Sequence, residues 1–234
     1  MHWFRRWRRE PALTPAQRER LVQYEGLPAC TADIDFSELP VLVADVETTG
    51  LNPHRDRLIS IGALSLVDGV IHLNSEFSVV LKQPEASDTA NILVHGIDGS
   101  TQRNGCDPVE ALLAFLAYAG KSCIVGFHAD FDRVVINRAC RKYLGMEPVN
   151  RWLDLAYLAP AVCLSPEERR SPEGLDAWLQ RYGISNFSRH SAVSDALATA
   201  QLLLVVLAEA RARGLRRIDQ LVELEKAQRW LRHS

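Results

Sequence analysis

The chain has 234 residues, 47% of them hydrophobic and 24% charged, which suits one globular domain of ordinary size with extensions. The net charge of −2 gives no global basic signature for nucleic acid, although a local patch and a metal site would serve a nucleic-acid enzyme. The five cysteines are widely spaced and odd in number, which argues against a disulfide framework or a zinc site and favours a reduced, cytoplasmic protein. No signal peptide and no membrane span are expected, because no uninterrupted apolar run reaches membrane-spanning length.

An N-terminal extension precedes the first apolar strand. Residues 1–10 contain four Arg, two Trp and one Phe. This segment suits contact with phosphates and stacking on bases, or an anionic membrane surface, but packing of its aromatic residues on the domain is favoured. A helix is predicted to begin after the N-cap Thr14, with Gln17 as its capping-box partner, and to end at Gly26.

Three strands are predicted in succession. Residues 41–47 form a short apolar run, rich in β-branched side chains, which is typical of a strand buried on both faces. Residues 58–67 and 70–81 are predicted as two further strands, antiparallel because only Asp68-Gly69 separates them. Residues 82–100 are expected to be irregular.

The remaining chain alternates helices with short apolar segments, which indicates an α/β layered domain. Apolar residues at helical spacing predict helices at 107–120, 128–145, 175–182, about 188–213 and 215–232. Residues 122–127 are predicted as another buried strand, and periodicity leaves 153–162 as either strand or helix. Pro160 and Pro166 are expected to flank a loop.

Two acidic residues end the first strand. Asp45 and Glu47 point to one face, with Val46 opposite, because strand side chains alternate. An ionised carboxylate that leaves water needs a cation or strong donors, and two converging acids suit a hard divalent cation. The alternative is a strand end with an acidic turn, in which residues 48–50 simply make the corner.

Two later acids lie at comparable positions. Asp132 follows the strand at 122–127, and Asp195 opens a helix five residues after His190. An open α/β sheet builds its site at the C-terminal ends of strands and at helix N-termini. Each acid alone fits a helix cap or a first turn. Four of them together with a His indicate a catalytic site.

These residues resemble the motifs of the DnaQ-like family of 3′-5′ exonucleases, the DEDD group. The three motifs are matched by Asp45-Val-Glu47-Thr-Thr-Gly-Leu51, Val125-Gly-Phe-His-Ala-Asp-Phe-Asp132 and His190-Ser-Ala-Val-Ser-Asp195. His in the third motif marks the DEDDh branch, and Val94-His-Gly-Ile97 resembles a short element of that branch. The resemblance covers about residues 40–210. It departs from the family at His128, where many relatives carry Asn, and at Asp130, an extra acid beside the site.

The resemblance implies a ribonuclease H-like fold: three layers, α/β/α, around a central mixed five-stranded sheet whose first three strands are antiparallel. It also implies a two-metal site, in which Mg²⁺ or Mn²⁺ ions roughly 3.5–4 Å apart stabilise the attacking and leaving oxygens of an in-line displacement. Asp45 would bridge both ions, and His190 would take the proton from the attacking water. The implied metal ligands are Asp45, Glu47, Asp132 and Asp195. The implied substrate contacts are Thr48, Thr49, Gly50, Leu51, His95 and Phe131, with Leu51 as an apolar wedge against the terminal base.

The function implied is metal-dependent 3′-5′ exonuclease activity on single-stranded DNA ends, releasing 5′-nucleoside monophosphates in proofreading or repair, with a DNA polymerase as an expected partner. RNA trimming is the alternative among enzymes. A non-catalytic polymerase accessory module is the alternative outside them, although a pure binder has no use for buried, mutually repelling carboxylates. We expect an extension at 1–39, an exonuclease domain at 40–212 and a C-terminal amphipathic helix at 213–234, and the sequence leaves the oligomeric state open.

Overall fold

The computed structural model describes residues 11–31, 35–36, 41–170 and 173–233 of the chain. The aromatic and basic segment at 1–10 lies outside the described residues, so the prediction that it packs on the domain stays a prediction. The boundaries expected at residues 39 and 212 likewise stay predictions, although helices are found on both sides of the central fold.

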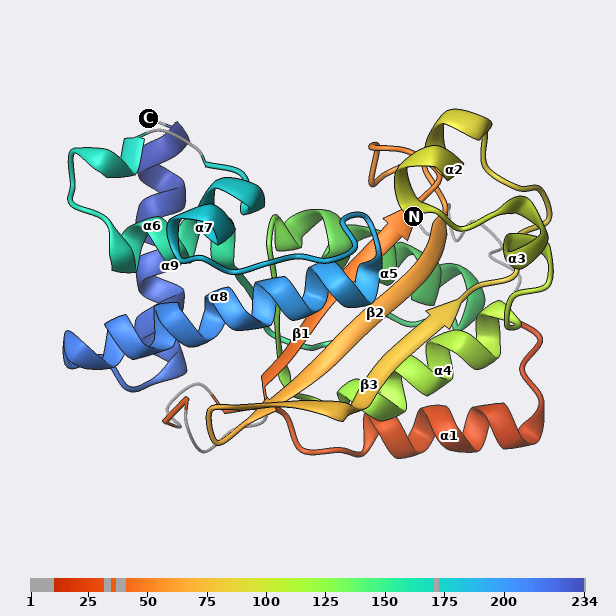
Figure 1. Cartoon of the computed structure of the whole chain (residues 1–234). Coiled ribbons are helices and arrows are strands. Elements are labelled where there is room, and N and C mark those ends of the chain that lie inside the picture. Colours follow the sequence, from red (N-terminus) through yellow and green to blue (C-terminus); the bar gives the residue numbers. More distant parts are fainter. Residues whose placement is uncertain (1–10, 32–34, 37–40, 171–172, 234) are drawn as a thin grey trace, which may run out of the picture.

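A five-stranded mixed sheet in the order β3-β2-β1-β4-β5 forms the centre of the fold (Figure 1). Its strands are β1 (Val41–Thr48), β2 (Leu58–Val67), β3 (Val70–Val80), β4 (Cys123–Gly126) and β5 (Trp152–Asp154). The first three strands pair antiparallel, whereas β4 and β5 continue the sheet parallel to β1. The predicted fold, ribonuclease H-like with a mixed sheet, is therefore confirmed.

The turn between β2 and β3 is the predicted two-residue hairpin. Asp68 and Gly69 both have positive φ, 52° and 74°, as a type I′ turn requires. Val67 pairs with Val70 directly across this turn. The register of the meander is thus set locally, by residues that tolerate left-handed backbone.

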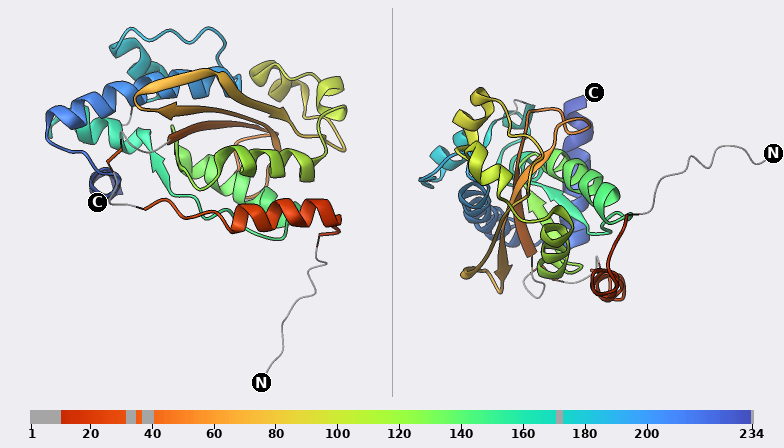
Figure 2. Two further views of the ribbon diagram at one scale, coloured as in Figure 1. Left: turned by 90° about the horizontal axis from the view of Figure 1, so that it is seen from below. Right: turned by 90° about the vertical axis from the view of Figure 1, so that its right-hand side faces the viewer.

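Helices cover both faces of the sheet (Figure 2). Their bounds are α1 (Pro15–Glu25), α2 (Thr89–His95), α3 (Gly99–Arg103), α4 (Pro108–Ala119), α5 (Ala129–Tyr143), α6 (Leu155–Cys163), α7 (Leu175–Arg181), α8 (Ala192–Ala212) and α9 (Ile218–His233), with a short 3₁₀ turn at Glu168–Arg170. Seen from the side, α4 and α5 lie against one face of the sheet and α8 against the other, with α1 outside α4. The predicted capping box of α1 is present, since Gln17 N donates to Thr14 Oγ1 at 3.3 Å and Thr14 N to Gln17 Oε1 at 2.9 Å.

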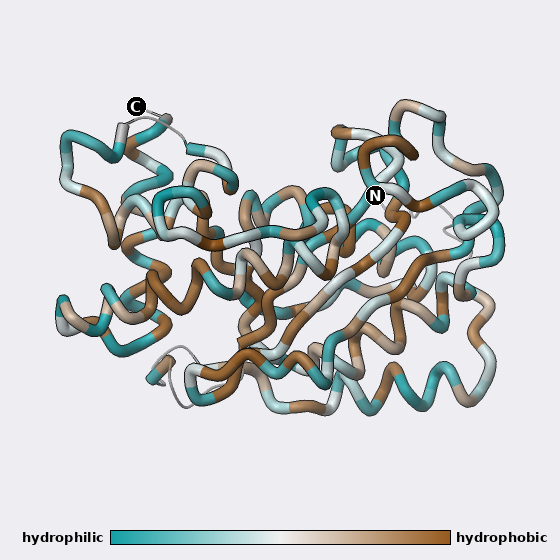
Figure 3. The backbone as a smooth tube through the Cα atoms, in the orientation of Figure 1, coloured by the Kyte–Doolittle hydropathy of each residue, from teal (hydrophilic) through white to brown (hydrophobic). Residues whose placement is uncertain are grey.

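The two faces of β1 feed two separate hydrophobic cores. Val41 and Val43 pack with residues of α6, α7, α8 and α9, whereas Leu42 and Ala44 pack with residues of α1, α4 and α5. Hydrophobic segments accordingly run along the central strands in Figure 3. By the same alternation, the side chains of Asp45 and Glu47 face the α8 side of the sheet.

Helix α8 is the one helix in the described part of the chain that is long and apolar enough, by length and composition, to cross a membrane. Of its most apolar window, 56% is buried inside the fold. Burial of this kind is what a central helix of a globular core requires. The stretch therefore serves as the core helix of this domain.

Two predictions of local structure are wrong. Residues 82–100 are not all irregular, because α2 and the start of α3 form there. Asp88 caps α2 by accepting from Asn91 N at 2.7 Å, and Gly96 ends it with a φ of 71°. These are short helices fixed by caps, which an apolar periodicity does not detect.

Pro160 lies inside α6 and does not flank a loop. Residues 153–162 divide into the end of β5 followed by α6. The helix buries Leu158, Ala159 and Val162, so tertiary packing outweighs the hydrogen bond that proline cannot donate.

Candidate active site

The two acids of β1 lie where the strand leaves the core. Their neighbour Val46 is buried on the opposite face, while Asp45 and Glu47 remain partly exposed. Asp45 pairs across the sheet with Gly62 of β2. This pairing matters because Gly62 is the point at which the next part of the site approaches.

The N-terminus of α8 comes close to the sheet at Gly62. A Cβ atom on Gly62 would lie 2.3 Å from the backbone of Ala192 and Val193, so a glycine is required there. Because of this contact, Asp195, in the first turn of α8, lies beside the end of β1. The Asp195 side chain is buried and accepts from the backbone N–H of His190 at 3.0 Å.

The fourth acid arrives from the other face of the sheet. Asp132 lies in the first turn of α5, directly after β4, and is 4% exposed. Its Oδ1 accepts a hydrogen bond from the backbone N–H of Val46 at 3.1 Å. This bond ties Asp132 to the β1 backbone between the two acids of the strand.

Ligand oxygens of Asp45, Glu47 and Asp195 all lie within 4.8 Å of one another. Burial raises the pKa of Asp45 well above its usual range, and the neighbouring carboxylates of Asp132 and Glu47 raise it further. Burial and then the charge of Asp195 raise the pKa of Glu47 to about 8. An all-oxygen donor set under mutual repulsion fits a hard divalent cation, which would relieve that repulsion.

One cation in contact with this cluster was not predicted. Arg189 Nη1 lies 2.6 Å from Asp195 Oδ1, and Arg189 Nε lies 2.8 Å from Asp176 Oδ1, on α7. Its charge opposes the upward pKa shifts of Asp45 and Glu47. The position of Arg189, next to His190 in the sequence, could have indicated this contact, because a buried acid such as Asp195 needs a counter-charge.

Asn186 was also missed. Its Nδ2 donates to Asp195 Oδ1, and its Oδ1 accepts from Ser194 Oγ at 2.7 Å. The amide fixes the orientation of the Asp195 carboxylate from the loop before α8. Sequence spacing gave no sign of this, because Asn186 lies nine residues away in an irregular segment.

His190 lies at the rim of the cluster. Its backbone adopts a φ of 62°, and its side chain is exposed to solvent. The hydrogen bond from His190 N to Asp195 fixes the backbone of this residue. Proton transfer by its imidazole stays a prediction.

The last residue of β1, Thr48, and the loop after it, with Thr49, Gly50 and Leu51, carry the predicted substrate contacts. The Thr48 hydroxyl donates to Gly50 O, and Thr49 Oγ1 accepts from Arg57 N at 2.9 Å. Leu51 is 93% exposed. Arg138 of α5 donates to the carbonyl oxygens of Pro53 and Asp56, which anchors the far side of the loop. Binding of a nucleotide by this loop stays a prediction.

The two remaining predicted substrate contacts, His95 and Phe131, interact with other residues of the protein. His95 is buried, with Nδ1 accepting from Ile97 N at 2.9 Å and Nε2 lying 2.8 Å from Asn91 Oδ1. Burial lowers its pKa. Phe131 packs against the core under α5. Contact of either side chain with substrate stays a prediction.

Comparison with known proteins identifies a family over most of the chain. The family model described as Exonuclease (RNase_T) matches residues 42–203. The PolC-type DNA polymerase III of Thermotoga petrophila is 27% identical over 193 residues, which cover 82% of this chain and 14% of that protein. A DNA polymerase III subunit epsilon-like protein of Rhodobacter capsulatus is 30% identical over 193 residues, covering 81% of this chain and 27% of the relative. The chain thus spans only a small part of these relatives.

Solved structures share the fold. Exonuclease I of E. coli in complex with a dT13 oligonucleotide superposes with a TM-score of 0.62 and 20% identity. The match covers 75% of this chain and 42% of that one. At this identity the likeness supports the ribonuclease H-like fold, already evident from the sheet.

Proposed function

The chain belongs to the DnaQ-like exonuclease family, and from this premise we propose that it is a metal-dependent 3′-5′ exonuclease of the DEDDh type acting on single-stranded DNA ends. One observation carries the proposal: acids from β1, α5 and α8 converge, and three of them have ligand oxygens within 4.8 Å of one another. These elements lie far apart in sequence. Their convergence on one point has a strong electrostatic cost that a bound cation removes.

The donor set fits two Mg²⁺ or Mn²⁺ ions. Asp45, Glu47 and Asp195 would hold one ion, and Asp45 with Asp132 the other. Bound there, such ions supply a nucleophilic water and neutralise the charge that develops on the phosphate. Mg²⁺ and Mn²⁺ prefer carboxylate oxygen, which is the donor offered here.

The protein's own side chains would deprotonate the attacking water, hold the metal-binding carboxylates and position the terminal nucleotide. Because its side chain is exposed at the rim, the His190 imidazole would accept the proton of the attacking water and pass it to solvent. Asn186 and Arg189 would keep the Asp195 carboxylate in place. The 48–51 loop, anchored through Arg138, would receive the terminal nucleotide, with Leu51 against its base.

A DNA substrate is favoured by the names of the relatives. The relatives described above are named as DNA polymerase III proteins, and the structural neighbour was solved with a dT13 oligonucleotide. We extend this to the chain as a proposal, together with a role in proofreading or repair beside a polymerase. RNA trimming is the competing outcome, since the acid cluster carries the chemistry and not the choice of sugar.

The test is digestion of matched 5′-labelled oligonucleotides, as single-stranded DNA, duplex DNA and RNA, in Mg²⁺, Mn²⁺ or EDTA. The expected result is a ladder shortened from the 3′ end of single-stranded DNA, with 5′-monophosphate products, abolished by EDTA. Faster shortening of RNA would transfer the proposal to RNA trimming. No cleavage of any substrate in either metal would contradict it.

A further inference from the structure

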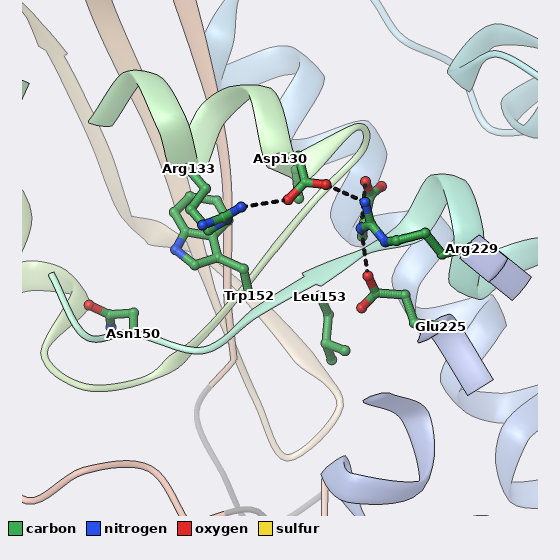
Figure 4. Close-up of a pocket in the computed structure, with 9 residues that line it drawn as sticks. Asp130, Arg133, Asn150, Trp152, Leu153, Glu225 and Arg229 are labelled. Carbon is green, nitrogen blue, oxygen red and sulfur yellow. Dashed lines mark hydrogen bonds and ion pairs between the residues drawn. The ribbon is translucent and has the colours of Figure 1, made fainter. Parts of the chain in front are cut away.

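A second group of acids lies behind Asp132, where α5, β5 and α9 meet. Asp130, Asp154 and Glu225 line a pocket of about 450 Å³ together with Arg133 and Arg229. Figure 4 shows Asp130 between the two arginines, with Glu225 reaching Arg229 from the other side. Asp154 is 3% exposed and Glu225 8%, so two of these three carboxylates are buried.

Arg229 links the three acids. Its guanidinium forms ion pairs with Asp130 and, at 2.8 Å, with Glu225, and its Nη2 lies 3.7 Å from Asp154 Oδ2. Its carbon centre lies 4.3 Å from the ring centroid of Tyr157, on α6. One side chain of α9 therefore contacts α5, the β5–α6 junction and α6 together.

The two flanking acids connect Arg229 to Asp132 by short paths. Asp130 lies two residues before Asp132, on the same first turn of α5. Asp154 Oδ1 accepts from the backbone N–H of His128, at the start of α5, at 2.9 Å, and from Ala156 N at 2.9 Å. Asp154 also adds its negative charge to the surroundings of Asp132. The first turn of α5, which sets the position of the Asp132 side chain, is thus held on the side away from β1 by Asp130 and Asp154, whose charges Arg229 neutralises.

We propose that Arg229 is a positioning residue for the metal-binding carboxylate of Asp132, and that α9 completes the active site from outside the region that the exonuclease family model matches. This inference rests on the proposed function. Helix α9 begins at Ile218, after the residues 42–203 matched by the family model. Without the guanidinium, Asp154 and Glu225 lose their ion-pair partner and Asp130 keeps only Arg133, so we expect the α5 turn to move away from β1.

The test is the affinity for Mn²⁺, measured by electron paramagnetic resonance of the free ion, with folding followed by circular dichroism. Arg229→Gln is expected to raise the Kd for Mn²⁺ about tenfold, as loss of a supporting group around a metal site typically does. Arg229→Lys keeps the charge without the planar fork and is expected to recover part of the affinity. Arg232→Gln, on the same helix and beside the same Tyr157 ring, is the matched control with an unchanged Kd.

A second variant keeps the inference testable if Arg229→Gln alone does not fold. Arg229→Gln combined with Glu225→Gln leaves the net charge of the pocket unchanged, and its Kd is also expected to rise because the tie to Asp130 is lost. A native Kd in either folded variant would overturn the inference. Asp45→Asn separates the two proposals: if the native chain binds no Mn²⁺, or Asp45→Asn keeps it, the proposed function fails whatever Arg229 does.

Discussion

Two clusters of acids, one on each side of the α5 N-terminus, differ in how their charge is balanced. At the end of β1, Asp45 and Glu47 meet Asp195, and the cation in contact is Arg189, which Asp176 shares. Behind α5, Asp130 pairs with both Arg133 and Arg229, and Glu225 pairs with Arg229. In the first cluster the carboxylates outnumber the cation that contacts them, whereas in the second cluster Asp130 and Glu225 form ion pairs with arginines.

The pKa of Asp130 shifts in the opposite direction from those of the β1 acids, whereas burial raises the pKa of Asp154 and of Glu225 as well. Burial and neighbouring acids raise the pKa of Asp45 and of Glu47. Although burial acts to raise the pKa of Asp130, hydrogen bonds from Arg133 and Arg229 lower it. Acids that are paired within the protein hold elements together. Acids that are left to repel one another are poised for a cation from solution.

Asp45→Asn should break the first cluster most severely. It removes the carboxylate that faces the other three acids, so we expect exonuclease activity to fall about a thousandfold, equivalent to roughly 4 kcal/mol of activation free energy. The release of mononucleotides from labelled single-stranded DNA measures this. Asp68→Asn, in the hairpin turn where Asn is equally suited, is the isosteric control. Activity of Asp45→Asn within tenfold of native would refute the site assignment.

His190→Gln should separate chemistry from metal binding. Loss of a general base typically costs 10²–10⁴-fold in rate, and we expect kcat to fall by about that factor while the Kd for Mn²⁺ stays within about twofold. His72→Gln, on the exposed face of β3, is the control. A metal affinity lost together with activity would make His190 a ligand or a structural residue.

Metal affinity should depend on pH at the first cluster. The pKa of Glu47 is raised to about 8 from an ordinary value of 4.5, so at neutral pH a metal must displace its proton. Apparent affinity is then expected to rise by up to about tenfold per pH unit for each proton displaced between pH 6 and 8, and to level off above. Calorimetric titration with Mn²⁺ in two buffers of different ionisation enthalpy would count the protons; a flat profile would contradict the raised pKa.

The raised pKa of Glu47 also makes the stability of the metal-free protein depend on pH. The folded state keeps the Glu47 proton to about pH 8, whereas the unfolded chain loses it near pH 4.5, so the folded state binds more protons between these values. The contribution of this group to the free energy of unfolding therefore falls as pH rises through that window.

Gly62→Ala should give the smallest of these effects on chemistry, through geometry alone. The added Cβ would lie 2.3 Å from the Ala192 backbone and push the start of α8 off the sheet. We expect a loss of about 1–3 kcal/mol in the free energy of unfolding and a severalfold weaker Mn²⁺ affinity. Gly174→Ala, which meets no atom within 4 Å, is the control. Chemical denaturation measures the first quantity, and equal behaviour of the two variants would argue against close packing at Gly62.

The sequence allowed the fold and the four acids to be predicted because their signals are local. Alternation in β1, the Asp68-Gly69 turn and the motif spacings around Asp132 and Asp195 all lie within short windows. The arginines that balance the acids could not be assigned to their partners, because Arg189 reaches Asp176 and Arg229 reaches Asp130 only after folding. Asp130 was taken as an extra acid beside the site, whereas its ion pairs place it in the second cluster.

Two local errors have the same origin. The helix α2 depends on the Asp88 cap and the left-handed Gly96, and neither produces an apolar period. Pro160 is tolerated in α6 by burial against neighbouring helices, which no local rule predicts. Gly62 gave no signal either, since its importance comes from the backbone of α8 packed upon it.

Anomalous diffraction from crystals soaked in Mn²⁺ tests the central claim most directly, because it places the ion in one of the two acid clusters. The account predicts anomalous density between Asp45, Glu47 and Asp195, with a second peak between Asp45 and Asp132, and none between Asp130 and Glu225. Density confined to the second cluster, or absent from the first at saturating Mn²⁺, would contradict it.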